Sequence, residues 1–256
     1  MRGELVLSTS TLLGFLMTLA RVGGLFVFVP IPGMGLRANQ ARIVLTLCIA
    51  IALFPNWPHP SAALSGAEMA GWLIDEAALG IGIGLTVGFV LEGFYVAAQI
   101  MGLQAGYAYA STIDPNSQAD SSVLVIFAEM AVGLLFFALG LDREVIGIFA
   151  RSMEIAPAGS LVLARGPAAQ LLYLGGLMFS TGVRLALPIV AVLLLIDISL
   201  ALLGRVNAQL QLLTIAFPLK MMVALTIIGW LVLLMPGILR NEANLSFAAA
   251  RTLVAR

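Results

Sequence analysis

The sequence predicts an all-α protein of six to seven apolar helices, arranged as helical hairpins, that lies in a membrane or in an obligate helical assembly. The chain has 256 residues, 61% of them hydrophobic, and a mean hydropathy of +1.07. Only 10% of its residues are charged, whereas soluble domains are typically about 25% charged. Because so few charges cannot cover a water-facing surface, and no stretch has the composition of a separate soluble domain, we expect one domain over residues 1–256.

The composition also argues against several classes of partner and chemistry. Lys and Arg number 13, as do Asp and Glu, so the basic excess that nucleic-acid binding needs is missing. Cys48 and His59 are the only cysteine and histidine, which leaves no cysteine cluster and little support for histidine-based hydrolases. The sequence has no Gly-x-Ser-x-Gly or His-Glu-x-x-His motif. We therefore expect no enzyme, no cofactor, no metal site and no nucleic-acid partner.

Three helices are expected in the first hundred residues, because a membrane crossing needs about 20 predominantly apolar residues. The first covers residues 5–28 and reads as part of the mature chain, since no small-residue cleavage pattern of a signal peptide follows it. The second, residues 43–54, is short and ends at a proline-rich turn that begins with Pro55. A loop to Glu68 then precedes a third helix over residues 77–99.

Glycines in the third helix recur on one face, at Gly80, Gly84 and Gly88. Faces of small residues let two helices approach closely in a membrane. We expect this face to be a site of tight helix packing.

Four more helices are expected in the rest of the chain. Residues 123–141 form an apolar run, and residues 145–155 form an amphipathic one that Pro157 ends. Residues 171–203 exceed one bilayer thickness, because about 33 residues at 1.5 Å each are longer than its hydrocarbon core. The last helix is expected over residues 218–239.

Six charged residues fall inside or at the edges of these apolar helices. A charge at the centre of a membrane helix costs about 2.5–3.5 kcal/mol on insertion scales. Two interpretations remain open: a proton or ion pathway, as in a secondary transporter, or buried pairing against other helices or subunits. No inverted repeat of the kind that transporters show is visible. The six residues are Arg21, Glu92, Glu129, Arg184, Asp197 and Lys220.

Three segments, residues 21–55, 98–157 and 207–225, carry a family resemblance. The first has Arg-x-x-Gly with a proline-rich end, and the second has Gly-Leu-Gln preceding Asp-Pro. The third has Asn-x-Gln-Leu leading to Phe-Pro-Leu-Lys. In order and spacing, over nearly the whole chain, these motifs resemble the FliR family, the export-gate R-subunits of flagellar type III secretion and their injectisome counterparts.

The resemblance implies a channel-forming subunit with no catalytic site. Such a subunit assembles with P-type and Q-type subunits, next to B-type and A-type export proteins, in the inner membrane within the flagellar basal body. Residues 1–160 would be similar to a P-subunit, and residues 161–256 to the helical hairpin of a Q-subunit. The cargo would be unfolded flagellar proteins, with the injectisome as the alternative system.

The resemblance also assigns two sets of residues. The segment around residues 106–121 looks like the inner loop that plugs the closed channel, which agrees with the rule that irregular backbone at membrane depth must be buried or line a water-filled cavity. Its expected residues are Met101, Gln104, Gly106, Tyr107, Tyr109, Asp114, Pro115 and Asn116. An ordinary external loop is the alternative. The turn of the Q-like hairpin would include Asn207, Gln209, Phe217 and Pro218, with Lys220 facing a carboxylate of a neighbouring subunit.

Overall fold

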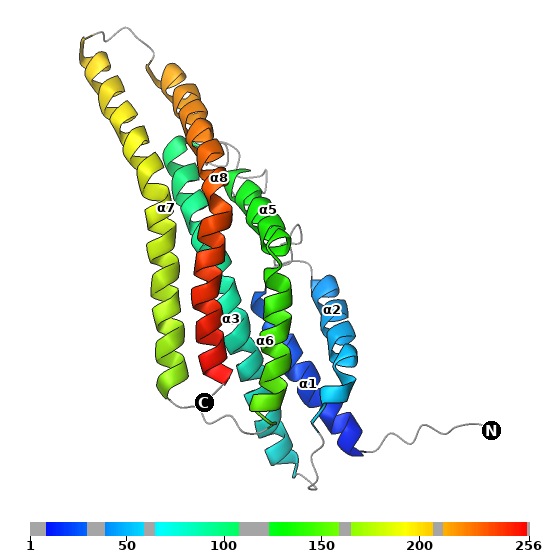
Figure 1. Ribbon diagram of the computed structural model, residues 1–256. Coiled ribbons are helices and arrows are strands. Elements are labelled where there is room, and N and C mark those ends of the chain that lie inside the picture. The colour runs from blue at the N-terminus through cyan, green and yellow to red at the C-terminus, as the bar shows by residue number, and fades with distance from the viewer. Residues whose placement is uncertain are drawn as a thin grey trace, which may run out of the picture. The chain divides into compact units, whose positions relative to one another are not determined.

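The computed structural model describes residues 9–29, 39–58, 65–107, 123–158, 165–206 and 212–254. Within these ranges every regular element is a helix, which confirms the all-α prediction (Figure 1). Four of the described helices are long and apolar enough to cross a membrane, or five spans if α5 and α6 count as one. The elements are α1 (Thr9–Phe28), α2 (Asn39–Ala52), the 3₁₀ helix η1 (Phe54–Asn56), α3 (Gly66–Ala105), α5 (Val123–Ala138), α6 (Leu141–Ile155), α7 (Arg165–Val206) and α8 (Leu212–Val254).

The chain divides into two compact units. Unit 1 comprises residues 1–89, 140–174 and 243–256, and unit 2 comprises residues 90–139 and 175–242. The three longest helices, α3, α7 and α8, therefore contribute to both units. Each unit has its own buried side chains and its own polar cluster, and each is described separately below.

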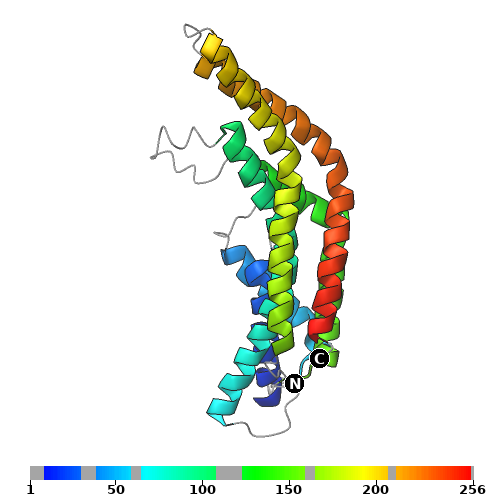
Figure 2. The same cartoon turned by 90° about the vertical axis from the view of Figure 1, so that its left-hand side faces the viewer.

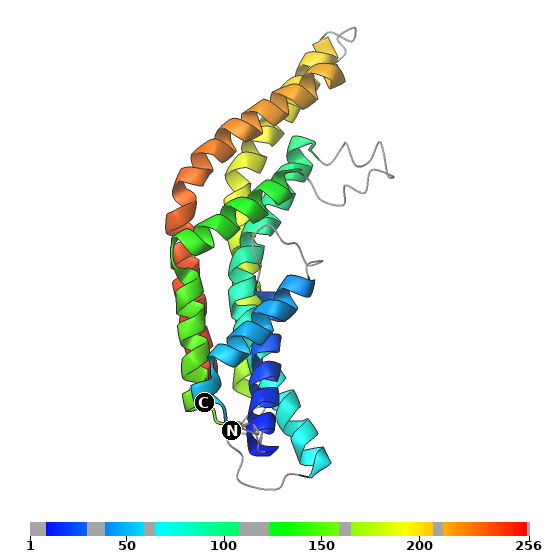
Figure 3. The ribbon, with the colours of Figure 1, turned by 90° about the vertical axis from the view of Figure 1, so that its right-hand side faces the viewer.

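In unit 1, α1 packs closely against the first half of α3 (Figure 3). A Cβ atom built on Gly80 would come within 2.0 Å of the Arg21 carbonyl oxygen, and one on Gly84 within 2.5 Å of the Leu25 carbonyl oxygen. A Cβ atom built on Gly24 of α1 would likewise come within 2.4 Å of the Ala77 carbonyl oxygen. The two backbones are thus in direct contact, which confirms the glycine face predicted on α3.

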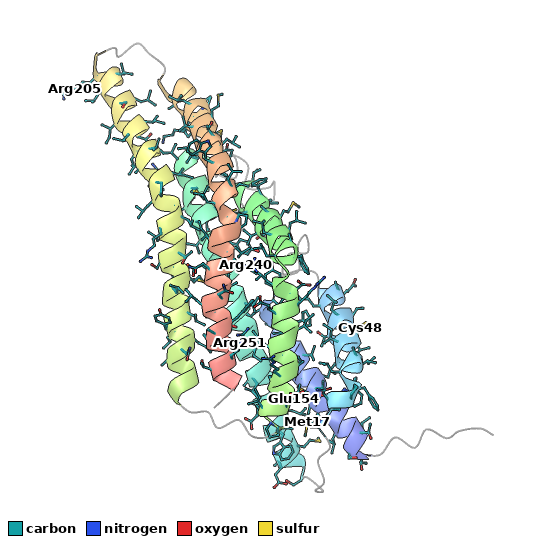
Figure 4. The ribbon with its side chains drawn as sticks, viewed as in Figure 1. Met17, Cys48, Glu154, Arg205, Arg240 and Arg251 are labelled. Carbon is teal, nitrogen blue, oxygen red and sulfur yellow. The ribbon has the colours of Figure 1, made fainter. Side chains whose placement is uncertain are left out.

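The helix α2 lies beside α1 in unit 1 (Figure 1). Trp57, which follows η1, packs its ring 5.1 Å from that of Phe15 and donates a hydrogen bond of 2.8 Å to the Ala50 carbonyl oxygen. The amphiphilic tryptophan side chain thereby fixes the chain as it leaves α2. Cys48 lies on the exposed side of α2 (Figure 4).

The start of α3 differs from the prediction, which placed a loop up to Glu68 and the first helical residue at 77. The helix begins at Gly66, where Ser65 and Glu68 form a capping box. The Ser65 N–H donates to the Glu68 carboxylate at 2.9 Å, and the Glu68 N–H donates to the Ser65 hydroxyl oxygen at 3.3 Å. This Ser-x-x-Glu pattern was visible in the sequence, and it outweighs the loop-like composition around it.

In unit 2, the second half of α3 packs with α5 and with the adjoining parts of α7 and α8, which run side by side (Figure 2). Small residues again allow close contact: a Cβ atom on Gly182 would lie 2.9 Å from the Gly93 carbonyl oxygen. The most completely buried apolar side chains of this unit include Phe94, Val132, Ile189, Leu193 and Ala224.

Two helix boundaries in the second half of the chain were also predicted wrongly. The helix α8 begins at Leu212, so Phe217 and Pro218 lie inside it rather than at its start, and it continues to Val254. The helix α7 likewise extends over 42 residues with Pro188 inside. Proline inside such helices is tolerated where neighbouring groups satisfy the freed backbone carbonyl, so a proline does not mark a boundary here.

Candidate functional site

Arg21 of α1 is the centre of a buried polar cluster in unit 1. Its side chain and that of Glu76 on α3 are each 1% exposed. The Arg21 Nε donates to Glu76 Oε2 at 2.5 Å, and its Nη2 donates to Oε1 at 2.9 Å. This bidentate geometry matches the planar guanidinium to the carboxylate.

The same guanidinium reaches the C-terminal end of α6. Its Nη1 donates to the Ser152 carbonyl oxygen at 2.8 Å, and its Nη2 donates to the Ala156 carbonyl oxygen at 2.8 Å. The last carbonyl groups of a helix have no partner within the helix and carry partial negative charge. Arg21 therefore caps α6 while it pairs with Glu76, and one side chain ties together three segments of unit 1.

Arg21 pairs with Glu76 on another helix, a partner that the sequence analysis did not single out. Glu76 was expected to lie before a helix, whereas the longer α3 places it on the face that contacts α1. The pair is 55 residues apart in sequence. Recognising the capping box at Ser65 would have put Glu76 inside the helix, one turn before Gly80 on the glycine face.

The second cluster lies in unit 2, where α3 ends. Gly106 has φ = 89°, a left-handed conformation that favours glycine. Its N–H donates to the Leu103 carbonyl oxygen at 3.2 Å, and the Tyr107 N–H donates to the Gly102 carbonyl oxygen at 3.0 Å. These two bonds form a Schellman motif, so α3 stops at a defined turn, here called the α3 turn (residues 104–107).

The α3 turn contacts α8. The ring of Phe217 lies so close to Gly106 that a Cβ atom there would come within 2.8 Å of it. The Tyr107 hydroxyl donates a hydrogen bond of 3.2 Å to the Met221 carbonyl oxygen. Burial raises the pKa of this phenol above its ordinary value, so the hydroxyl remains a neutral donor at physiological pH.

Asp197 of α7 joins the same region to α8 by an ion pair. Its Oδ1 lies 2.5 Å from the Lys220 Nζ, and its Oδ2 accepts a hydrogen bond of 3.3 Å from the Gln104 side-chain amide. The Lys220 side chain is 14% exposed and that of Asp197 is 39% exposed. Residues predicted on separate grounds, as plug, buried charge and hairpin turn, thus meet at one place.

The other three charged helix residues behave differently. Glu92, Glu129 and Arg184 are exposed, and none forms an ion pair with another residue in the described ranges. Glu92 of α3 and Glu129 of α5 are close enough for their like charges to interact. Of the six charged residues, which the sequence placed either on an ion pathway or in pairs with other helices or subunits, Arg21, Asp197 and Lys220 form ion pairs within the described part of the chain.

Several predicted site residues cannot be compared with the structure. Tyr109, Asp114, Pro115, Asn116, Asn207 and Gln209 lie outside the described residues. Met101 lies within α3, 3% exposed, and lines an apolar pocket of unit 2 together with Phe94, Leu124 and Met235. Within the described ranges no three metal-ligating side chains gather. The described residues of the predicted plug therefore contribute to helix packing and to the α3 turn. The plugging role of the segment stays a prediction.

These features define the class of protein: an all-α membrane protein whose long apolar helices carry internal ion pairs. A family described as "Bacterial export proteins, family 1" matches residues 12–245. The chain belongs to this family, which confirms the resemblance to the FliR and type III export proteins drawn from its motifs.

Individual relatives are similar over most of their length. The chain is 29% identical to flagellar biosynthetic protein FliR of Escherichia coli over 212 residues, which is 82% of this chain and 81% of the relative. It is 27% identical to the protein of the same name from Caulobacter vibrioides, over 82% of this chain and 84% of that one. The surface presentation of antigens protein SpaR of Salmonella typhimurium is 25% identical, over 95% of this chain and 89% of that protein.

Proposed function

We propose that this chain is the R-type, channel-forming subunit of a flagellar type III export gate. It assembles with P-type and Q-type subunits, beside the B-type and A-type export proteins, in the inner membrane of the flagellar basal body. The gate passes unfolded flagellar proteins. Within the single domain, residues 1–160 take the place of a P-like part, and residues 161–256 that of a Q-like hairpin.

One structural observation supports an obligate assembly most strongly. Only 22% of the most apolar stretch of α7, and the same share of α8, is buried within the chain. Large apolar side chains such as Leu172, Trp230 and Leu233 are at least 78% exposed. Lipid alone would cover such faces, but the exposed charges at Glu92, Glu129 and Arg184 are costly in lipid and are better accommodated by neighbouring helices.

The flagellar system is supported over the injectisome by the names of the relatives, since flagellar FliR proteins from several bacteria are similar to this chain. The similarity to SpaR supports the injectisome as a second candidate. Both candidates share a gate subunit without catalytic chemistry, and they differ in the neighbouring proteins and in the cargo.

Gentle purification of a tagged chain from its native cell, followed by mass spectrometry, tests the proposal. We expect P-type and Q-type export subunits in one particle, and flagellar rather than injectisome proteins around it. A stable, monodisperse particle that holds this chain alone would overturn the gate and would support a transporter. Transport assays on Glu92, Glu129 and Asp197 variants would then follow.

A further inference from the structure

We propose that the Asp197–Lys220 ion pair positions the α3 turn, the last described residues before the segment that we predict to be the plug. This inference rests on the proposed function for its biological meaning. Its physical content, the position of residues 104–107 in unit 2, can be tested independently of export.

The first reason is that one carboxylate serves two helices at once. Asp197 on α7 holds Lys220 on α8 through Oδ1 at 2.5 Å and accepts the Gln104 amide of α3 through Oδ2 at 3.3 Å. The charge of Lys220 fixes the carboxylate, and the carboxylate orients the amide. Loss of either charged partner therefore loosens the third group, although Lys220 and Gln104 share no recorded hydrogen bond.

The second reason is that α8 contacts the turn on both sides of the ion pair. Phe217, three residues before Lys220, lies against Gly106, and Met221, the residue after it, accepts the Tyr107 hydroxyl at 3.2 Å. A rotation or shift of α8 that separated Lys220 from Asp197 would also displace these two contacts. The turn and the α7–α8 pair are thus mechanically linked.

The third reason is that the Asp197–Lys220 ion pair is only moderately strong. The two charged side chains are partly exposed, at 14% and 39%, and partly exposed pairs are easier to break than buried ones. Among the described residues, the turn is held by the two backbone bonds of its Schellman motif and by the side-chain bonds of Gln104 and Tyr107 to α7 and α8. A small displacement of α8 relative to α7 is therefore enough to release residues 104–107.

The test measures accessibility at the α3 turn in the complete complex. Cys48, which is exposed, is replaced by serine, and Ala105, which is fully buried in the α3 turn, is replaced by cysteine as the reporter. Thiol modification rates are compared among Asp197→Asn, Lys220→Met and the charge reversal Asp197→Lys with Lys220→Asp. Arg240→Met, which removes from α8 an exposed cation that forms no ion pair with the described residues, is the matched control (Figure 4).

We expect the two single variants to raise the modification rate about fivefold, which corresponds to the loss of one partly exposed ion pair. The reversal restores the rate toward that of the parent, and Arg240→Met leaves it unchanged. Unchanged rates in both single variants overturn the proposal. A reversal that behaves like the single variants also overturns it, because side-chain packing rather than charge pairing would then hold the turn.

Two further measurements keep the result interpretable. Co-purification of the P-type and Q-type subunits is recorded for every variant, and if the charge variants fail to accumulate, Gln104→Leu replaces them, because it leaves the ion pair intact. A raised rate in Gln104→Leu supports the proposal, and an unchanged rate contradicts it. If the parent chain co-purifies with no export subunits, the proposed function fails while the modification rates still decide the positioning role.

Discussion

The two polar clusters of this chain both place charged side chains among apolar helices, but they differ in how deeply the ion pair is buried and in how many partners it has. In unit 1, Arg21 and Glu76 are 1% exposed and every nitrogen of the guanidinium has an acceptor, including the carbonyl oxygens at the end of α6. In unit 2, Lys220 and Asp197 are partly exposed, and the carboxylate is shared with one amide. Arginine provides a rigid planar fork for several fixed acceptors, whereas lysine provides a mobile point charge.

This comparison indicates that the burial of an ion pair determines whether the pair is a fixed structural contact or one that can be broken at modest cost. Removing one partner of a buried pair leaves an uncompensated charge and costs about 3–5 kcal/mol, whereas exposed pairs contribute about 1 kcal/mol or less. The Arg21 cluster is therefore a fixed structural centre, while the Asp197 cluster can be rearranged at modest cost. The following changes test this contrast, from the largest expected effect to the smallest.

The largest effect is expected for Arg21→Met. The substitution leaves the Glu76 carboxylate buried without its partner and removes the donors to the Ser152 and Ala156 carbonyl oxygens. We expect a loss of about 3–5 kcal/mol in the free energy of unfolding. Thermal unfolding of the purified protein in detergent, together with its amount in the membrane, measures this loss.

A charge reversal sharpens the contrast between the clusters. Arg21→Glu with Glu76→Arg restores opposite charges, but a glutamate at position 21 donates nothing to the end of α6. We expect no recovery of stability, unlike the reversal proposed for Asp197 and Lys220. Full recovery would show that charge pairing alone matters in unit 1 and that the capping of α6 is incidental.

Gly80→Ala is expected to have the next largest effect. The new Cβ atom would lie 2.0 Å from the Arg21 carbonyl oxygen, so α1 must move away from α3. Overpacking of this kind costs about 1–3 kcal/mol. Gly82→Ala is the control, because a Cβ atom there meets nothing within 4 Å, and alanine is favoured over glycine in helices by about 1 kcal/mol. Equal melting temperatures for the two variants would contradict the close α1–α3 contact.

Gly106→Ala combines two smaller penalties. Its φ of 89° is unfavourable for alanine by about 1–2 kcal/mol, and the new Cβ atom would lie 2.8 Å from the Phe217 ring. Gly140→Ala has the same left-handed strain, with φ = 71°, but no atom within 4 Å. The difference between the two variants in thermal stability isolates the contact with Phe217, and no difference would mean that the ring moves aside freely.

Tyr107→Phe is expected to have the smallest effect. It removes the hydrogen bond to the Met221 carbonyl oxygen and keeps the ring, at a cost of about 0.5–1.5 kcal/mol. Hydrogen exchange of the backbone amides at the end of α3 reports this change better than global unfolding, because the effect is local. Protection equal to that of the parent protein would show that the hydroxyl does not hold the turn.

The sequence was sufficient for the helical class, for the glycine face and for most of the helices, because apolar runs and small-residue spacing act locally. It was also sufficient to single out Arg21, Asp197 and Lys220, since charges in apolar helices are costly. It could not supply their partners. Glu76 joins Arg21 only because the glycine face brings α1 onto α3, and Gln104, in the last turn of α3, reaches Asp197 only because the end of α3 packs beside α7 in unit 2.

Helix ends were the weakest part of the prediction, for a physical reason. Proline was taken as a start signal at Pro218, but α8 continues through it, as long apolar helices can where other groups satisfy the freed backbone carbonyl. At Ser65 the opposite error occurred, since a capping box of two side chains decided the boundary against the average composition.

The three-way contact of Arg21 has a consequence for the timing of synthesis. Its acceptors at the end of α6 lie 131 and 135 residues further along the chain. At roughly 5–20 residues per second, the ribosome delivers them about 7 to 27 seconds after Arg21 itself. During that interval α1 and α3 can pair through Glu76, but two donors stay without their final acceptors. The contact of Arg21 is thus completed only after the unit 2 residues between its partners, 90–139, have been made.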